Sequence, residues 1–435
     1  MGVVEDMDKA QEPTGEGMTR RRFLWHSAGA AMGGLGALYL AGCAGAAGTT
    51  TTTGQAASTT TTANVASAST TTIPPTTTSI PPTTTTAAAP ISPAKVRVKA
   101  ISQIAIVVED IEKTASDYWN ILGVGPWAIY KWEAPLVHDR VYRGKPADAD
   151  ERIALTQLAN VQFELVTPGT KPSIYRDWLD ERGEGLHHIQ FLVDSVDGVY
   201  EVNDTLAKQG YEAVQYAKVG PADNEGAYSY IDMMDPLGCI WEPAKGGDVP
   251  AKPLKVPADE KAAIPAKIGI PGGISQIGIA VHDVEETAWN YWNTLGIGPW
   301  TVIDWQWPLV YDKKYGSKLS PGRDRIALTQ LGDVLLELVM PVEGKSCYRD
   351  WLEKHGPSIH HVQSLVGTVN AVYAAGKIFE GMGYPPIGSG TFGPETEPGA
   401  YLYSDCTKDL KCVWETMKNG SLGDLTVPRM VPPTA

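Results

Sequence analysis

Beyond about residue 96 the chain alternates between apolar runs typical of strands and segments with helical spacing. Residues 101–108 predict a buried strand, and Asp110 precedes apolar positions with helical spacing up to Gly123, so we expect a capped helix there. The strand-like pieces that follow are 127–132, 152–158 and 161–167. The pattern therefore predicts one strand, one helix and three further strands.

The same order of elements returns in the next part of the chain. A polar helix over 173–182 leads into a strand over 186–193 and a helix over 196–209. The strands expected next lie near 211–219, 226–232 and 238–242. The Asp235 to Gly238 segment contains the Pro and Gly of a tight hairpin turn. The unit is thus an α+β fold of two βαβββ modules.

Adjacent histidine pairs reveal a repeat of the whole unit. His187 and His188 recur as His360 and His361, an offset of 173 residues. A period of this length indicates a duplicated domain rather than a solenoid. We expect one domain over 96–243, a linker over 244–273, a second domain over 274–417 and a tail over 418–435. Such a chain would be a monomeric pseudo-dimer.

The first 95 residues have the layout of an export signal followed by a stalk. Arg20, Arg21 and Arg22 precede a small-residue apolar run, which favours a twin-arginine signal within 1–48. The sequence before Cys43 is similar to a lipobox, which would attach a lipid to that cysteine on the outer face of the cytoplasmic membrane; a plain signal peptide is the alternative. Residues 49–95, mostly Thr, Ala, Ser and Pro, predict a disordered stalk.

Charge and cysteine content narrow the choice of partners. The net charge of -14 and the lack of a clustered basic segment argue against nucleic-acid binding. We expect no membrane contact other than the lipid at Cys43. Cys406 and Cys412 flank a predicted hairpin turn and could form a disulfide outside the cell.

Four polar positions keep the 173-residue offset inside apolar strands. Carboxylates in such strands cost several kcal/mol unless they are paired or coordinated. The repeated positions are Gln103 with Gln276, Glu164 with Glu337, His188 with His361, and Glu242 with Glu415. Two facing modules would bring one set together, and these oxygen and nitrogen donors suit Zn, Ni, Co or Mn with room for substrate.

Taken singly, each of these positions also fits an ordinary strand residue. A glutamate could face solvent or pair with an arginine such as Arg152. Strand alternation places His187 and His360 on the opposite face, where they would pack in the core or support a ligand from behind. The first module of one domain could also pair with the second module of the other, because both arrangements give the same ligand set.

The βαβββ pairs that carry Gln103, Glu164, His188 and Glu242 resemble the vicinal oxygen chelate superfamily. The order Gln, Glu, His, Glu is similar to the metal ligands of glyoxalase I. Segments such as Leu-Gly-Val-Gly-Pro before Trp127 are closer to the methylmalonyl-CoA epimerase-like branch. The resemblance covers about 96–243 and 274–417.

The resemblance implies a metal-dependent epimerase or isomerase that moves a proton next to a metal-held carbonyl or thioester. It implies Glu242 and Glu415 as the first candidates for the base, with Glu164 and Glu337 as ligands or second bases. Glyoxalase I-type lyase chemistry and a non-catalytic binding protein are the alternatives. Extradiol dioxygenases of the superfamily bind iron with two histidines, and Gln103 replaces the first, which argues against oxygen chemistry.

Overall fold

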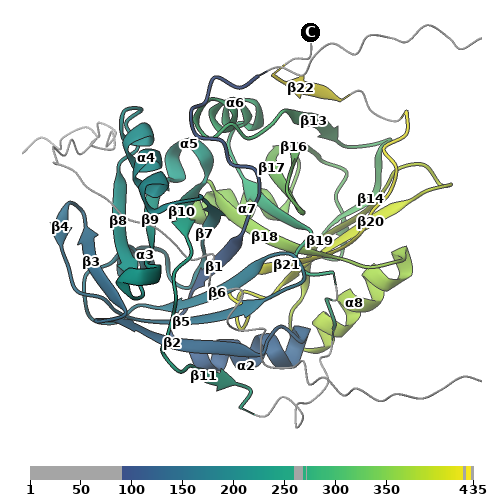
Figure 1. Cartoon of the computed structure of the whole chain (residues 1–435). Helices are drawn as coiled ribbons and strands as arrows, with labels where there is room; N and C mark the ends of the chain where they lie inside the picture. The colour runs from purple at the N-terminus through teal and green to yellow at the C-terminus, as the bar shows by residue number, and fades with distance from the viewer. Residues whose placement is uncertain (1–90, 259–267, 271, 425–427, 433–435) are drawn as a thin grey trace, which may run out of the picture. The chain divides into compact units, whose positions relative to one another are not determined.

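A computed structural model describes residues 91–258, 268–270, 272–424 and 428–432 (Figure 1). The predicted export signal, the lipid site at Cys43 and nearly all of the predicted stalk lie outside these residues. The last stalk residues are packed against the second domain, where the Ser92 hydroxyl donates to the Trp292 carbonyl at 2.5 Å and Ala94 is buried. No helix in the described ranges is long and apolar enough to cross a membrane.

The first domain consists of two successive βαβββ modules, with a hairpin inserted into the first. Its elements are β1 (Gln103–Val107), α2 (Ile111–Leu122), β2 (Trp127–Glu133), β3 (Val137–Tyr142), β4 (Lys145–Pro146), β5 (Asp150–Gln157), β6 (Gln162–Thr167), α3 (Ile174–Arg182), β7 (Gly185–Leu192), α4 (Val196–Ala207), β8 (Ala213–Val219), the 3-10 turn η1 (Ala222–Asn224), β9 (Gly226–Met233), α5 (Met234–Leu237) and β10 (Cys239–Lys245).

The second domain repeats this order. Its elements are β12 (Gln276–Ala280), α6 (Val284–Thr294), β13 (Trp300–Trp305), β14 (Val310–Tyr315), β15 (Lys318–Leu319), β16 (Arg323–Leu331), β17 (Val334–Glu343), α7 (Cys347–His355), β18 (Ser358–Leu365), α8 (Val369–Gly381), β19 (Pro386–Phe392), β20 (Gly399–Asp405) and β21 (Val413–Lys418). Two further strands, β11 (Leu254–Val256) and β22 (Arg429–Val431), lie in the segments predicted as linker and tail.

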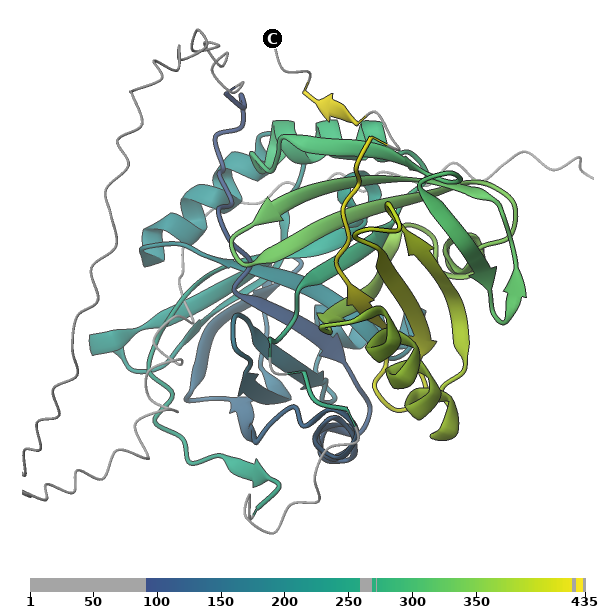
Figure 2. The same ribbon diagram turned by 90° about the vertical axis from the view of Figure 1, so that its right-hand side faces the viewer.

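Each domain is built on one continuous sheet, and the modules of one domain pair with each other. In the first sheet the order is β11-β2-β5-β6-β1-β7-β10-β9-β8-β3-β4, with β1 and β7 antiparallel at the centre. The second sheet has the matching order around β12 and β18. Figure 2 shows its green to yellow strands from another side. The arrangement in which modules are exchanged between domains is therefore not the one adopted.

Local sequence explains where the predicted helices begin and end. The Asp110 side chain accepts a hydrogen bond from the Lys113 amide at 3.0 Å, as an N-cap does. Gly123 ends the helix with φ of 67°, a conformation that costs glycine little. The glycine that ends α2 and the aspartate that begins it were both readable from the sequence.

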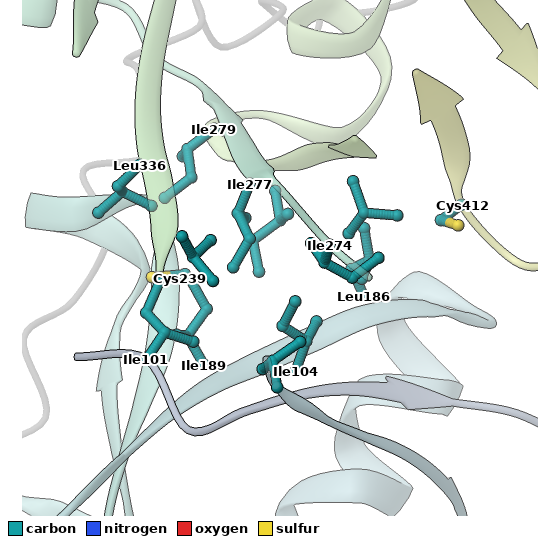
Figure 3. Packing of buried hydrophobic residues seen from close by; sticks show 14 of the residues in the cluster. Ile101, Ile104, Leu186, Ile189, Cys239, Ile274, Ile277, Ile279, Leu336 and Cys412 are labelled. Carbon is teal, nitrogen blue, oxygen red and sulfur yellow. The ribbon is translucent and has the colours of Figure 1, made fainter. Parts of the chain in front are cut away.

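One face of each sheet packs into an apolar core that both domains share. The core cluster includes Ile104 and Ile189 of the first domain with Ile277 and Ile279 of the second, all fully buried (Figure 3). Each such side chain contributes about 1.5–3 kcal/mol by leaving water. The contact is nearly symmetric, because Tyr118 donates to the Leu410 carbonyl at 2.7 Å and Tyr291 to the Leu237 carbonyl at 2.9 Å.

Several local expectations were wrong. The Asp235 to Gly238 segment contains the end of a one-turn helix, α5, rather than a tight hairpin turn. The β3–β4 hairpin was not predicted, because its exposed and buried residues do not alternate regularly. The linker and tail each contribute a three-residue strand, which is too short to show a period.

The proposed disulfide is also absent from the described part of the chain. Cys239, Cys347, Cys406 and Cys412 are all free and buried. Cys412 Sγ lies 3.4 Å from the Tyr118 hydroxyl, so this thiol belongs to the contact between the domains. The prediction of a Cys406–Cys412 bond was therefore wrong.

Candidate metal centres

In the first domain the four repeated polar side chains meet around His188. From His188 Nε2 the distances are 3.1 Å to Glu242 Oε2, 3.3 Å to Glu164 Oε2 and 3.4 Å to Gln103 Oε1. Strand register produces this meeting: Ala105 pairs with both Glu164 and His188, and Gln103 is two residues away on the same face. The four adjacent strands β6, β1, β7 and β10 thus each supply one side chain.

The second domain repeats the arrangement around His361. Its Nε2 lies 3.2 Å from Glu415 Oε2 and 3.4 Å from Glu337 Oε2. Gln276 turns its amide nitrogen, rather than its oxygen, toward His361, at 3.5 Å. The two centres therefore share the two contacts between histidine and carboxylate and differ in the orientation of one amide.

Both centres are cut off from water, which shifts their proton equilibria. Glu164, His188 and Glu242 are at most 2% exposed. Burial raises the pKa of Glu164, and it raises the pKa of Glu337 well above its usual range, with the charge of Glu415 adding to the effect. Burial alone would lower the pKa of His188, but the charge of Glu242 and hydrogen bonds to Glu164 and Glu242 outweigh it and raise the pKa to about 9.

His187 does not point to the opposite face as strand alternation predicted. The pairing of β1 with β7 shifts register between Ala105 and Ile106, so His187 and His188 both face the site. Their Nδ1 atoms are 2.8 Å apart, and the same pair in the second domain, His360 and His361, are 3.0 Å apart. Because this contact occupies Nδ1 of His188 and of His361, the Nε2 atom of each of these two histidines is free to face the carboxylates. One β-bulge per domain reverses the predicted orientation.

Sequence reasoning missed Gln190, which connects two of the candidate ligands. Its Nε2 donates to Gln103 Oε1 at 3.0 Å and to Glu242 Oε2 at 2.8 Å, and its own Oε1 accepts from the Ser102 hydroxyl at 2.9 Å. Gln363 makes the matching contacts at 3.2, 2.7 and 2.8 Å. The offset of 173 residues also relates Gln190 to Gln363, so the repeat alone could have identified them.

Aromatic side chains close the site on the side of β9 and α3. The Tyr230 ring lies 4.9 Å from the His188 ring, between centroids, and the Tyr230 and Tyr175 hydroxyls are 2.5 Å apart. Tyr403 and Tyr348 repeat this pair in the second domain, with hydroxyls 2.6 Å apart. Rings in these positions exclude water from the imidazole and restrict its rotation.

The donor set fits a divalent cation. Two buried carboxylates face one imidazole. Glu242 Oε1 has no hydrogen-bonding partner among the described residues, and Glu164 Oε2 and Glu337 Oε2 have the imidazole beside them, at 3.3 and 3.4 Å. Two donor atoms that each lie about 2.0–2.2 Å from the same metal ion are roughly 3.0–3.5 Å from each other. The distances from His188 Nε2 to the other three donor atoms, 3.1–3.4 Å, match this separation. A cation would neutralise carboxylates that are otherwise costly to bury.

The side chains contact one another directly in both centres. As they stand, no group of three or more His, Cys, Asp or Glu side chains in the described ranges is arranged to hold an ion. The distances around His188 Nε2 and the free oxygen Glu242 Oε1 support the fit, and a glutamine is the fourth donor. A bound ion would replace the direct contacts between the carboxylates and the imidazole.

The family of the chain follows from a comparison with known proteins. The family sequence model of the Glyoxalase/Bleomycin resistance protein/Dioxygenase superfamily matches residues 102–228 and 275–396. The two matches cover more than half of the chain and fall one in each domain. The chain belongs to this superfamily, and it consists of two tandem domains of the vicinal oxygen chelate fold.

Individual relatives are distant. The uncharacterized protein YqjC of Bacillus subtilis (strain 168) is 25% identical over 146 residues, which are 32% of this chain and 93% of that protein. A mutant 4-hydroxymandelate synthase from Streptomyces coelicolor is 12% identical, with a TM-score of 0.47, over 74% of this chain and 94% of its own. The Mn(II)-bound glyoxalase from Novosphingobium aromaticivorans is 14% identical, with a TM-score of 0.40, over 75% and 83%.

Proposed function

We propose that the protein is a metal-dependent epimerase or isomerase that transfers a proton at the carbon next to a carbonyl or thioester. The observation that supports this is the pair of buried carboxylates around one imidazole in each domain. Two carboxylates at one centre allow one to hold a cation while the other moves a proton. The methylmalonyl-CoA epimerase-like branch is the part of the superfamily whose chemistry has this form.

The residues divide into holding and proton-moving roles. Gln103, Glu164, His188 and Glu242 would hold the ion in the first domain, and Gln276, Glu337, His361 and Glu415 in the second. A bound Zn, Ni, Co or Mn ion supplies a Lewis acid that makes the adjacent C–H bond more acidic. We assign the proton transfer to Glu242 and Glu415, with Glu164 and Glu337 as the second carboxylates.

The hydrogen bonds of the site leave one carboxylate oxygen of Glu242 available, whereas burial raises the pKa of the second carboxylates, Glu164 and Glu337. Gln190 holds Glu242 Oε2 and leaves Oε1 without a hydrogen-bonding partner in the described residues. That oxygen is the proton acceptor we assign.

A glyoxalase I-type lyase is a second candidate, favoured by the order of the four donors along the chain. It uses the same proton transfer and differs in the substrate. A non-catalytic binding protein is a third candidate, and the low exposure of both centres favours it. These three functions predict different outcomes in one assay.

The test measures exchange of carbon-bound hydrogen in D₂O by NMR. The metal-loaded protein is given a panel of thioesters, ketones and 2-oxo aldehydes with thiol. Epimerase chemistry predicts exchange without a net product, and lyase chemistry predicts a hydroxy-thioester product. The double variant Glu242→Gln, Glu415→Gln should lose exchange by about 100-fold or more. Glu133→Gln, an exposed glutamate of β2, is the matched control.

Tight binding of a substrate without exchange or product would support the binding protein. Absence of metal from the purified and reconstituted protein would contradict the proposal itself. Metal content by elemental analysis is therefore measured on every variant.

A further inference from the structure

A second polar cluster lies on the same face of the first sheet as the candidate metal ligands. Arg140 of β3 donates through Nη1 to Glu151 Oε2 at 2.9 Å and through Nη2 to Gln215 Oε1 at 2.9 Å. Gln215 Oε1 also accepts from the Ile174 amide at 3.1 Å. Arg140, Glu151 and Gln215 are each at most 4% exposed. The cluster is therefore as deeply buried as the metal centre.

Strand register connects this cluster to the metal centre. Glu151 is on the face of Leu155, which pairs directly with Glu164. Gln215 pairs directly with Tyr230, the ring that lies against His188. Tyr228, two residues from Tyr230, feels the charges of Arg140, Glu151 and Glu242. The cluster therefore lies beside the metal centre on the same face of the sheet.

Two hydrogen-bond donors of the cluster have no partner among the described residues. They are Arg140 Nε and Gln215 Nε2. A buried donor without an acceptor is costly, so such groups are normally paired with protein, water or a ligand. Both of these atoms donate, and one belongs to a guanidinium group, whose bonds to carboxylates are among the strongest in proteins. Glu151 Oε1 also lacks a partner in hydrogen-bonding geometry, but it lies 2.6 Å from Arg140 Nη2 and forms part of that ion pair.

The second domain lacks this pair of donors. At the matching positions Lys313 Nζ donates to Asp324 Oδ2 at 2.7 Å and to the Gly322 carbonyl at 2.9 Å, and Gly388 replaces Gln215. The unpaired atom of this set is Asp324 Oδ1, an acceptor that matches Glu151 Oε1 of the first domain, so the difference lies in the two missing donors. The two domains thus have the same metal ligands and different clusters beside them.

We propose that Arg140 and Gln215 bind a carboxylate of the substrate, and that only the first domain accepts such a substrate. The inference rests on the proposed function and narrows it. The substrate of the first domain is a carbonyl compound with a carboxylate group, bound through its carbonyl oxygen at the metal centre and its carboxylate at Arg140 Nε and Gln215 Nε2. The second domain selects a substrate without that group.

The probes are a series of oxo acids of increasing length, from pyruvate to 4-oxopentanoate, each compared with its methyl ester. Binding to the full metal-loaded chain is measured by isothermal titration calorimetry. One acid of the series should bind at one site per chain, at least tenfold more tightly than its ester.

Two substitutions each remove one of the unpaired donors. Arg140→Lys keeps a cation for Glu151 and reproduces the residue of the second domain, but it removes Nε together with the guanidinium contact to Gln215 Oε1. Gln215→Glu keeps an acceptor for Arg140 and for the Ile174 amide and removes Nε2. Each should reduce the preference for the acid by about tenfold or more. Arg152→Lys and Gln157→Glu on β5, where Arg152 is half-buried and Gln157 exposed, are the matched controls and should leave the preference unchanged.

The outcomes separate this inference from the proposed function. If the chain takes up two metal ions but prefers no acid, or if both variants keep the preference, water alone occupies the cluster and the inference is wrong. If the chain takes up no metal, the proposed function fails, and the acid preference is still measurable because neither donor needs the metal. Thermal unfolding of each variant shows that loss of binding is not loss of fold.

Discussion

Gln190→Leu removes the side chain that holds two candidate metal ligands in place. In the native domain its amide donates to Gln103 Oε1 at 3.0 Å and to Glu242 Oε2 at 2.8 Å. Leucine has a similar volume and no donor. The substitution therefore leaves all four ligands in the chain and removes their connection, together with the bond from the Ser102 hydroxyl to Gln190 Oε1.

The expected loss of affinity follows from these two contacts. A bond between neutral groups contributes about 0.5–1.5 kcal/mol, and one to a carboxylate about 1.5–3 kcal/mol. Their sum, roughly 2–4 kcal/mol, is the largest loss possible, because part of it is recovered when the freed ligands find the ion. We expect metal affinity of the first domain to fall about 10–100-fold, the range found when groups that orient metal ligands are removed.

Calorimetric titration of the metal-free chain with Zn²⁺ measures this loss directly. Each chain should show two binding events, and Gln190→Leu should weaken one of them. Gln363→Leu, which loses the matching contacts at 3.2 and 2.7 Å, should weaken the other. Equal affinities in wild type and both variants would refute the positioning role, and weakening of both events by either variant would show that the substitution disturbs the fold.

Four further outcomes are expected. Glu164→Gln and Glu337→Gln should each remove one equivalent of bound metal, measured by elemental analysis, and the metal-free variants should unfold at higher temperature because each loses a buried carboxylate. Since the folded-state pKa of His188 is raised to about 9, its contribution to stability is full below about pH 6.5 and is lost as pH rises through 9. Urea unfolding of the metal-free chain should show this loss, and His188→Asn should not. His187→Phe, which removes the Nδ1 contact to His188, should weaken metal binding by about tenfold. A change in unfolding temperature with unchanged metal affinity would argue against a role of His187 in positioning His188. Arg21→Lys with Arg22→Lys should keep the chain in the cytoplasm of a bacterial host, as cell fractionation would show, whereas Lys9→Arg should leave export unchanged.

The positions of the candidate ligands could be predicted from the sequence because the two repeated domains can be compared with each other. Apolar strands rarely carry glutamate, and Glu164 and Glu242 each recur at the same offset as His188. The number of residues between them did not predict how far apart their side chains lie in the fold. The βαβββ order did imply that the strands carrying them are in the middle of the sheet. The structure brings them within 3.1–3.3 Å of His188 Nε2.

The orientation of His187 was not readable, because alternation holds only where the ladder is regular. The register shift beside Ala105 adds one residue to β7 and turns two consecutive histidines to one face. Nothing in the sequence of His187 and His188 distinguishes a bulge from a regular strand. Pairing with β1, which is about 80 residues earlier in the chain, decides it.

The sequence by itself determined the duplication, the α+β class, the helix ends at Asp110 and Gly123, and the four polar positions of each domain, because these depend on local periodicity and on the chain's likeness to itself. Only the tertiary structure decided that each domain pairs its own modules, that Cys412 meets Tyr118 and that Arg140 meets Gln215. These contacts join residues far apart in the chain, and they form because burial of apolar surface fixes register and partner together.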